Sequence, residues 1–366
     1  MNFLLILTSW WVLGTATPPA TVVESELLFP PSTVLQVHAS TLVETESGLV
    51  ASWFGGTSEQ NPDVVIWLTR QVDGDWTEPV VVASGAETED PPVNCLNPVL
   101  FQTPAGGPLL LFYKTGSWWA YVKRSTDGGV TWSKAERLAN SFYGPIKNKP
   151  VLLRDGSILS PSSTELAGPE GTAWKVHFER SLDGGNQWQR IGVLQDGLTI
   201  QSIQPSILIH GDGRLQALGR TRQGRLFEVW SPDDGRTWGR VELMDLPSNN
   251  SGTDAVTLND GRHLLAYNHV TNTQGQSGGP RSPLNLAVSA DGWRWGAALV
   301  LESEPDVEFS YPAIIQTRDG FVHLTYTWKR QSIKHVVIDP SRLRPRPIVD
   351  GRWPPDLGGS GAAGVD

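Results

Sequence analysis

The sequence predicts an all-β protein with the architecture of a six-bladed β-propeller. Three observations predict it: a short turn motif that recurs along the chain, a longer strand–turn–strand pattern that occurs six times, and the composition. The 366 residues include 38 Gly, 27 Pro and 16 Trp. This composition suits many short strands joined by tight turns better than it suits long helices.

The short turn motif joins a serine, an aspartate and a glycine-containing pair to a tryptophan. Asp and Gly supply the side-chain hydrogen bonds and the positive φ angles that tight turns need, and apolar residues flank each copy. Each copy therefore predicts a hairpin turn with a packed aromatic side chain. The copies are RSTDGGVTWSK at 124–134, RSLDGGNQWQR at 180–190, WSPDDGRTWGR at 230–240 and the degenerate VSADGWRWGA at 288–297.

The longer pattern sets the number of blades. A polar residue, often followed by Pro, opens a short apolar strand, and a second strand returns after a turn. The six copies start 59, 52, 55, 50 and 57 residues apart, about the length of four short strands with their turns. Six four-stranded blades are therefore expected. The copies begin at His38, Asn97, Lys149, Gln204, Asp254 and Tyr311.

The two ends of the chain complete the predicted domain plan. The last copy has a third strand but no clear fourth, and residues 21–29 predict a strand before the first copy. We therefore expect this N-terminal strand to complete the sixth blade. The propeller then covers residues 21–342. Residues 1–20 carry a short apolar run followed by small residues and predict a cleaved secretory signal, with a non-cleaved interfacial anchor as the alternative. We therefore expect the protein to be secreted or exported to the periplasm. Residues 343–366, rich in Pro and Gly, predict a loose tail.

Charge and cysteine content narrow the function classes. The net charge is −9 with no run of Lys or Arg, which argues against a nucleic-acid-binding groove but allows a small anionic ligand. Cys95 is the only cysteine, so a disulfide framework and a Cys-rich zinc site are excluded. The seven histidines show no metal-binding spacing, and we expect no metal or other cofactor. The mature chain contains no second long apolar segment, so we expect no integral membrane span in it.

Strand direction sorts the polar residues between the two faces of the propeller. Successive strands of a blade are antiparallel, so first-strand starts, second-strand ends and third-strand starts share one face, here called the upper face. The short turn motifs, between third and fourth strands, then lie on the lower face and are predicted to be scaffold. Polar groups that converge on the axis predict an axial pocket. Besides the six first-strand starts, the upper set contains Lys114, Glu165, Arg220 and His269 at second-strand ends, and Glu59, Asp63 and Arg281 ahead of third strands.

These residues resemble the sialidases (neuraminidases), whose propellers carry Asp-box repeats of the SxDGGxTW kind. The resemblance covers residues from about 33 to 340 and is closest to bacterial sialidase-like proteins with BNR repeats. It implies that Tyr311, in SYPAII, is a catalytic nucleophile. It also implies that Arg220 and Arg281 are the second and third arginines of a triad that binds the substrate carboxylate.

Three positions depart from the pattern of that family. The first arginine of the triad is His38 here, and the glutamate that activates the tyrosine falls on Gln204. The acid/base aspartate has Glu59 and Asp63 as candidates. A free tyrosine has a pKa of about 10 and needs a neighbouring carboxylate to take its proton, for which Glu165 and Asp254 are candidates.

The predicted substrate-binding set is completed by polar groups at the first-strand starts. A protonated His38 is expected to act as a third donor to the substrate carboxylate beside the two arginines. Asn97, Lys149 and Gln204 are further expected contacts with the sugar.

Three functions remain open at this point. The first is an exported exo-glycosidase that hydrolyses a terminal acidic sugar from glycans, with Tyr311 as nucleophile and a carboxylate as acid/base. The second is a carbohydrate-binding propeller without catalysis, for which Gln204 is the main argument. The third is a uronate-directed lyase that uses Tyr311 and His38 as acid and base.

Overall fold

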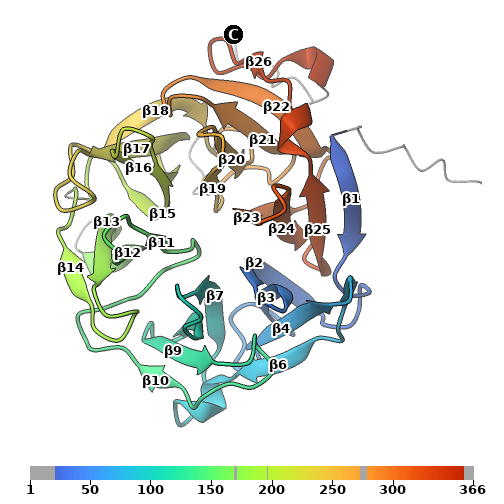
Figure 1. The fold of residues 1–366 in the computed structure, drawn as a ribbon, viewed down its shortest axis with the longest axis vertical. Helices are drawn as coiled ribbons and strands as arrows, with labels where there is room; N and C mark the ends of the chain where they lie inside the picture. The colour runs from blue at the N-terminus through green and yellow to red at the C-terminus, as the bar shows by residue number, and fades with distance from the viewer. Residues whose placement is uncertain (1–20, 169–170, 196, 273–277, 358–366) are drawn as a thin grey trace, which may run out of the picture.

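The structure is a computed structural model that describes residues 21–168, 171–195, 197–272 and 278–357. In this part of the chain, six antiparallel sheets surround a central axis (Figure 1). The predicted all-β six-bladed propeller is therefore confirmed. Residues 1–20, with the expected secretory signal, lie outside the described residues.

Each blade runs from an inner strand at the axis to an outer strand at the rim. Blade one contains β2 (Gln36–Thr45), β3 (Gly48–Gly56), β4 (Val65–Val72), β5 (Asp75–Trp76) and β6 (Val80–Ala83). Blade two contains β7 (Cys95–Gln102), β8 (Leu109–Thr115), β9 (Ala120–Ser125) and β10 (Glu136–Arg137). Blade three contains β11 (Val151–Leu152), β12 (Ile158–Gly168), β13 (Gly171–Ser181) and β14 (Gln189–Ile191).

The second half of the ring repeats this arrangement. Blade four contains β15 (Ser202–Ile209), β16 (Leu215–Thr221), β17 (Arg225–Ser231) and β18 (Glu242–Pro247). Blade five contains β19 (Asp254–Thr257), β20 (His263–Tyr267), β21 (Leu284–Ser289), β22 (Trp295–Glu302) and β26 (Arg346–Pro347). Blade six contains β23 (Phe309–Gln316), β24 (Val322–Trp328), β25 (Ser332–Ile338) and β1 (Val22–Leu27).

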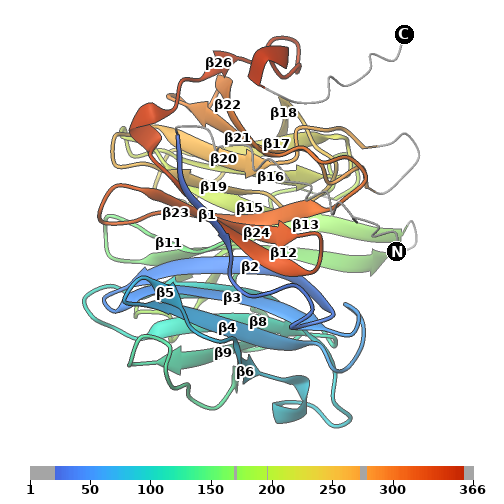
Figure 2. The same ribbon diagram turned by 90° about the vertical axis from the view of Figure 1, so that its right-hand side faces the viewer.

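The ring is closed by strands from the two ends of the propeller sequence. β1 pairs antiparallel with β25, with Val22 opposite Ile338 and Leu27 opposite Lys334 (Figure 2). The expectation that the N-terminal strand completes the sixth blade is confirmed. This pairing ties both ends into one sheet and leaves no open seam between the last blade and the first.

The C-terminal segment differs from the loose tail expected from its composition. β26 pairs with Gly296 and Ala297 of β22 and so adds a fifth strand to blade five. His269 Nε2 lies 2.8 Å from the carbonyl oxygen of Gly351. Pro347 is tolerated because β26 lies at the edge of the sheet. In the described part of the chain no further strand pairs with β26 on its outer side, so the missing N–H of proline breaks no hydrogen bond there. Residues 358–366 lie outside the described residues.

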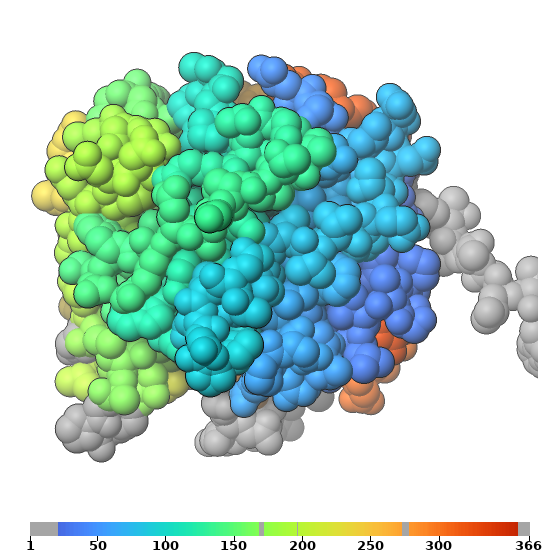
Figure 3. Space-filling view, turned by 90° about the horizontal axis from the view of Figure 1, so that it is seen from below, coloured from blue at the N-terminus to red at the C-terminus, as the bar shows by residue number. Residues whose placement is uncertain are grey.

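The hydrophobic core is divided into layers between neighbouring blades. Between blades four and five, Leu208 and Met244 pack with Tyr267 and Ala287. Figure 3 shows the outer wall of blades one to three, coloured from blue to green, as closely packed neighbours. Cys95 is buried in the layer between blades one and two, and burial raises the pKa of its thiol to about 12, as expected for a packing residue.

The Asp-box turns lie between the third and fourth strands, as the sequence predicted. In blade three, Asp183 Oδ1 accepts hydrogen bonds from Ser181 Oγ and from the backbone N–H groups of Asn186 and Gln187. The tryptophan at the end of a box can pack on the preceding blade: the ring of Trp238, in blade four, stacks on Phe178 of blade three with centroids 4.0 Å apart. The boxes therefore fix hairpins and connect blades.

Candidate functional site

The inner strands begin at the axis with a local irregularity that sets where their side chains lie. Asn97, Gln204 and Tyr311 have φ angles of 49°, 55° and 52°, and each precedes a proline. The pairing register with the second strand shifts at each of these points, which marks a β-bulge. A left-handed backbone costs roughly 1–3 kcal/mol at a side chain of this size. Strain repeated at the same end of three blades is typical of a functional site.

Tyr311 is the centre of the axial site. It is 8% exposed, and its ring centroid lies 4.1 Å from that of His38. The guanidinium carbons of Arg220 and Arg281 each lie 5.5 Å from the ring centroid. Blades six, one, four and five thus bring together four of the residues that the sequence analysis selected. We call Tyr311, His38, Arg220 and Arg281 the axial site.

An ion-pair chain borders the axial site and includes two residues that the sequence analysis missed. Arg281 Nη1 lies 2.5 Å from Glu308 Oε1, and Arg330 Nε lies 2.9 Å from Glu308 Oε2. Arg330 Nη1 in turn lies 2.6 Å from Glu59 Oε2. Arg281 and Arg330 hold the pKa of Glu308 below its ordinary value, although burial works in the opposite direction. Glu308 therefore remains a carboxylate that links two arginines.

A signal for these two residues is present in the sequence. Arg330 lies two residues after the end of β24, in TYTWKR, at the same end of its blade as Arg220. The residue of blade six that pairs as Arg220 does in blade four is Thr327. Glu308 lies three residues before Tyr311, in EFSY. The rule for second-strand ends finds Arg330 only when it is extended into the turn that follows the strand.

The two candidates for the acid/base carboxylate have different surroundings. Glu59 is joined to the axial site through Arg330. Asp63 is exposed and accepts hydrogen bonds of 2.9 Å from the backbone N–H and the hydroxyl of Thr57, within its own loop. The structure therefore places Glu59 beside the site, whereas Asp63 closes the turn that carries Glu59.

His38 differs from the protonated donor that the sequence analysis expected. It is buried, and burial together with nearby Arg330 and Arg281 holds its pKa well below 6.5. Its Nδ1 lies 2.9 Å from Thr327 Oγ1 and 3.5 Å from Glu308 Oε1. The latter contact is a charged pair only when the imidazole is protonated, which the cationic surroundings oppose. His38 is therefore a neutral imidazole, and the additional cation near the site is Arg330.

Asp254 and Lys149 form a structural pair. Asp254 Oδ2 accepts hydrogen bonds from Lys149 Nζ at 2.8 Å and from the backbone N–H of Ile314 at 2.9 Å. Its Oδ1 accepts from Ser206 Oγ and from the backbone N–H of Ala255. This carboxylate is buried and joins blades three, four, five and six. It contributes to the ring, and its lone pairs are occupied, which argues against a role as the base for Tyr311.

The other predicted residues lie around the same end of the axis. Gln204 is buried, and its backbone carbonyl oxygen accepts a hydrogen bond from Asn148 Nδ2. Asn97 is 9% exposed at the equivalent bulge of blade two. Glu165 lies directly opposite Trp174 in the β12–β13 pair, and the Trp174 ring lies 5.2 Å from the Arg220 guanidinium carbon. Glu165 is therefore on the sheet face that borders Arg220.

Lys147 adds a buried amine near the tyrosine. Its Nζ donates hydrogen bonds to the carbonyl oxygens of Thr253 and Pro312. Burial lowers its pKa to about 7, with Lys149 and Arg220 contributing in the same direction and Asp254 opposing them. Its Nζ lies 6.0 Å from the Tyr311 ring centroid. The axial site therefore has cations or buried amines on several sides and suits an anionic ligand.

The described part of the chain offers neither a metal site nor a membrane-spanning helix. No group of three or more His, Cys, Asp or Glu side chains there is arranged to hold a metal ion. The helices described are short 3₁₀ turns, and none has the length and apolar character of a membrane-spanning segment.

A family model described as a BNR repeat-like domain matches residues 47–324. The chain belongs to the BNR repeat-like family. No curated protein matches the sequence. Among solved structures, this BNR repeat-like protein is similar to a protein of unknown function from Dyadobacter fermentans, with 19% identity and a TM-score of 0.71 over 89% of this chain and 99% of that one.

Two similar structures have names that state an activity. The NanB sialidase from Streptococcus pneumoniae is 12% identical, with a TM-score of 0.68 over 87% of this chain and 71% of that one. The intramolecular trans-sialidase from Ruminococcus gnavus is 14% identical, with a TM-score of 0.68 over 90% of this chain and 100% of that one. At these identities the likeness shows a shared sialidase-like propeller fold, in agreement with the resemblance found in the sequence.

Proposed function

We propose that this BNR repeat-like protein binds the terminal acidic sugar of a glycan at the axial site and hydrolyses its glycosidic bond. The observation that carries the proposal is the position of Tyr311, whose ring lies 5.5 Å from the guanidinium carbons of both Arg220 and Arg281. The sialidase-like fold supports the same class of substrate.

The arginines account for the choice of an acidic sugar. Guanidinium groups bind carboxylates in bidentate geometry, and the pairing is strong where water is excluded. Arg220 and Arg281 approach from blades four and five, and Arg330 adds a third guanidinium from blade six. A carboxylate on the sugar would therefore orient the ring over Tyr311.

In the proposed reaction, the Tyr311 oxygen attacks the anomeric carbon while the bond to the leaving oxygen breaks. In this proposal Arg330 turns from Glu59 to the substrate carboxylate, Glu59 takes up a proton from solvent and donates it to the leaving oxygen, and Glu165 takes the phenol proton. A water then attacks the glycosyl-tyrosine, Glu59 removes its proton, and the phenol recovers the proton from Glu165. Hydrolysis with retained configuration at the anomeric carbon follows.

One observation favours a second candidate, a uronate-directed lyase. His38 and Tyr311 are in ring contact, and the imidazole is neutral because its pKa is held well below 6.5 by burial and by neighbouring arginines. A neutral imidazole can remove the proton next to an arginine-bound carboxylate, while the tyrosine donates a proton to the leaving oxygen.

Product analysis separates these functions. Purified protein is incubated with a panel of sialosides and of uronic-acid glycosides, and the products are examined by mass spectrometry and by absorbance of unsaturated sugars. Free acidic sugar supports hydrolysis, and an unsaturated sugar supports the lyase. Binding without any product would replace both reactions by a carbohydrate-binding role.

We also propose that the protein is exported, with residues 1–20 as a cleaved signal, so that the axial site meets glycans outside the cytoplasm. N-terminal sequencing of protein from the extracellular or periplasmic fraction tests this. A chain that begins at residue 1 and stays in the cytoplasm would contradict it.

A further inference from the structure

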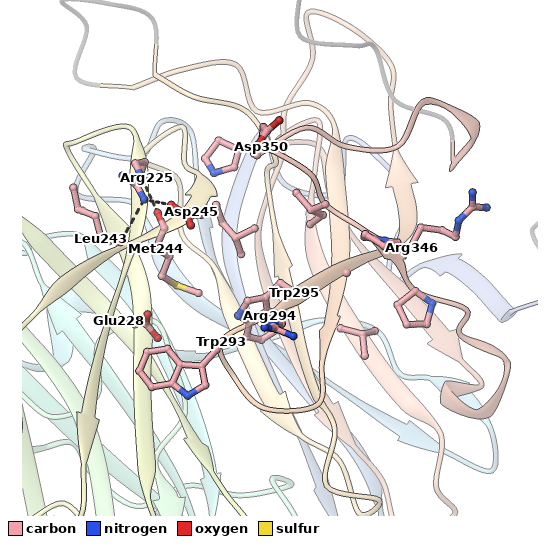
Figure 4. Close-up of a pocket in the computed structure, with 18 of the residues that line it drawn as sticks. Arg225, Glu228, Leu243, Met244, Asp245, Trp293, Arg294, Trp295, Arg346 and Asp350 are labelled. Carbon is pink, nitrogen blue, oxygen red and sulfur yellow. Dashed lines mark hydrogen bonds and ion pairs between the residues drawn. The ribbon is translucent and has the colours of Figure 1, made fainter.

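A cavity lies at the outer edge of blades four and five, and none of the axial-site residues lines it (Figure 4). Its volume is about 1140 Å³, slightly above the roughly 300–1,000 Å³ of typical small-molecule sites. Strands β17, β18 and β22 contribute to its walls, and residues 345–351 of the C-terminal segment close one side. Met244, Leu246, Trp295 and Ile348 supply apolar lining and belong to or pack on the core between the two blades.

The degenerate Asp box of blade five places an unusual residue in this cavity. This box is one residue shorter than the others, and it has Trp293 where they have Val130, Asn186 and Arg236. The turn does not require tryptophan, because the other three boxes form it without one. Trp293 is nevertheless 52% exposed, and it lines the cavity.

Trp293 is held as a flat platform. One face of its indole stacks on Trp230, with centroids 4.3 Å apart and planes inclined by 17°. Trp230 is itself fixed, since its Nε1 donates a 3.0 Å hydrogen bond to Glu228 Oε2 and the Arg214 guanidinium carbon lies 4.9 Å from its ring. The half-exposed Trp293 ring therefore has its second face open, at the end of the cavity where Figure 4 shows Glu228 beside it.

The charges around the cavity indicate an uncharged ligand. Arg225 pairs with Asp245, Arg262 with Asp260, and Arg346 with Asp356. Arg294 also lines the cavity together with the carboxyl groups of Glu228 and Asp350, so groups of both signs are present. Paired charges offer hydrogen-bond donors and acceptors without a net attraction for an anion. This differs from the axial site, where several cations surround one tyrosine.

We infer that this cavity is a second, non-catalytic carbohydrate site that binds a neutral sugar of a glycan chain by stacking on Trp293. An aromatic face covers the C–H face of a pyranose, and polar groups at the edge of the ring bind its hydroxyls. Glu228 and Arg225 supply such groups within the same cavity. The inference does not rest on the proposed hydrolysis, because the two sites share no residue.

The test measures binding of the full chain to immobilised neutral oligosaccharides, namely β-linked galactose and N-acetylglucosamine oligomers. The parent protein should bind at least one of them. Trp293→Val, which copies the residue of the blade-two box, should bind about tenfold more weakly, the loss expected for a stacking aromatic. Trp293→Phe should keep most of the affinity.

Trp119→Val is the matched control. Trp119 is also exposed, at 40%, and has a guanidinium on its ring, from Arg137 at 3.6 Å, but it belongs to blade two. Its removal should not change binding. Melting curves show whether each variant is folded, and Trp293→Arg, as in the blade-four box, replaces the valine variant if that one unfolds. The inference is overturned if no neutral oligosaccharide on the panel binds, or if Trp293→Val and Trp293→Arg bind as the parent does.

Discussion

The imidazole of His38 lies against the phenol ring of Tyr311, with centroids 4.1 Å apart and planes inclined by 49°. The resemblance to sialidases places an arginine where His38 stands. In this structure a guanidinium comes instead from Arg330, in the turn between β24 and β25, and it shares Glu308 with Arg281. The proposed carboxylate site thus keeps three arginines, although one of them comes from a different blade.

Arg330→Ala tests this relocation. The variant should weaken binding of an acidic monosaccharide by roughly 2–4 kcal/mol, because it removes a cation and leaves Glu308 with one partner fewer. Lys329→Ala is the control, since Lys329 is the neighbouring residue in the same turn but pairs with Glu304. Isothermal titration calorimetry measures both. Equal affinities for the parent and Arg330→Ala would show that Arg330 does not contact the ligand.

Glu59→Gln and Asp63→Asn test the acid/base assignment. Glu59→Gln should lower kcat by about 10²–10⁴ on a substrate with a poor leaving group, as expected for loss of a general acid. The loss of bond cleavage should be much smaller with an activated aryl leaving group, which needs no proton. Asp63→Asn should leave kcat close to the parent value, because Asp63 bonds only within its loop in the described contacts. The reverse ranking of the two variants would refute the assignment.

Asp183→Ala tests the scaffold role of the Asp boxes. Loss of three hydrogen bonds at an exposed turn should lower the melting temperature by roughly 2–4 °C. Turnover per folded molecule should stay near the parent value, because the turn lies at the face opposite the axial site. A fully stable variant with a large loss of turnover would contradict the placement of the site.

Buried histidines should make the fold sensitive to acid. Burial lowers the pKa of His269 to about 4 and holds that of His38 well below 6.5, whereas the unfolded chain titrates near 6.5. As the pH falls below about 6.5, the unfolded state binds protons first, so the free energy of unfolding decreases between about pH 6.5 and 4. Melting temperatures across this range should fall, and His269→Gln should reduce the slope. A flat profile would contradict buried neutral histidines.

The sequence predicted the architecture because its determinants are local and repeated. Each Asp box is a complete turn within about ten residues, and the spacing of the inner strands counts the blades. The alternation of strand direction then placed Tyr311, Arg220 and Arg281 at one end of the axis. The location of these residues depends on their position along a strand, and a sequence pattern is enough to predict that position.

The sequence did not show which residues of different blades contact one another. Asp254 was a reasonable candidate base until the structure showed that Ser206, Lys149 and Ile314, from three other blades, occupy its oxygens. Likewise, the neutral state of His38 depends on its burial and on Arg330, which is 292 residues away in the chain. β26 has no hydrophobic periodicity, so its addition to blade five could not be read from composition.

The central claim is that Tyr311 forms a covalent bond with an acidic sugar, and mass spectrometry after incubation with a fluorinated acidic-sugar trap tests it most directly. Fluorine beside the anomeric carbon slows both steps, and a fluoride leaving group keeps the first step fast, so the glycosyl-enzyme should accumulate. The parent protein should carry an adduct on the peptide that contains Tyr311, and Tyr311→Phe should carry none although it still binds the sugar. A trapped adduct on another residue, or a Tyr311→Phe variant that turns over substrate as the parent does, would contradict it.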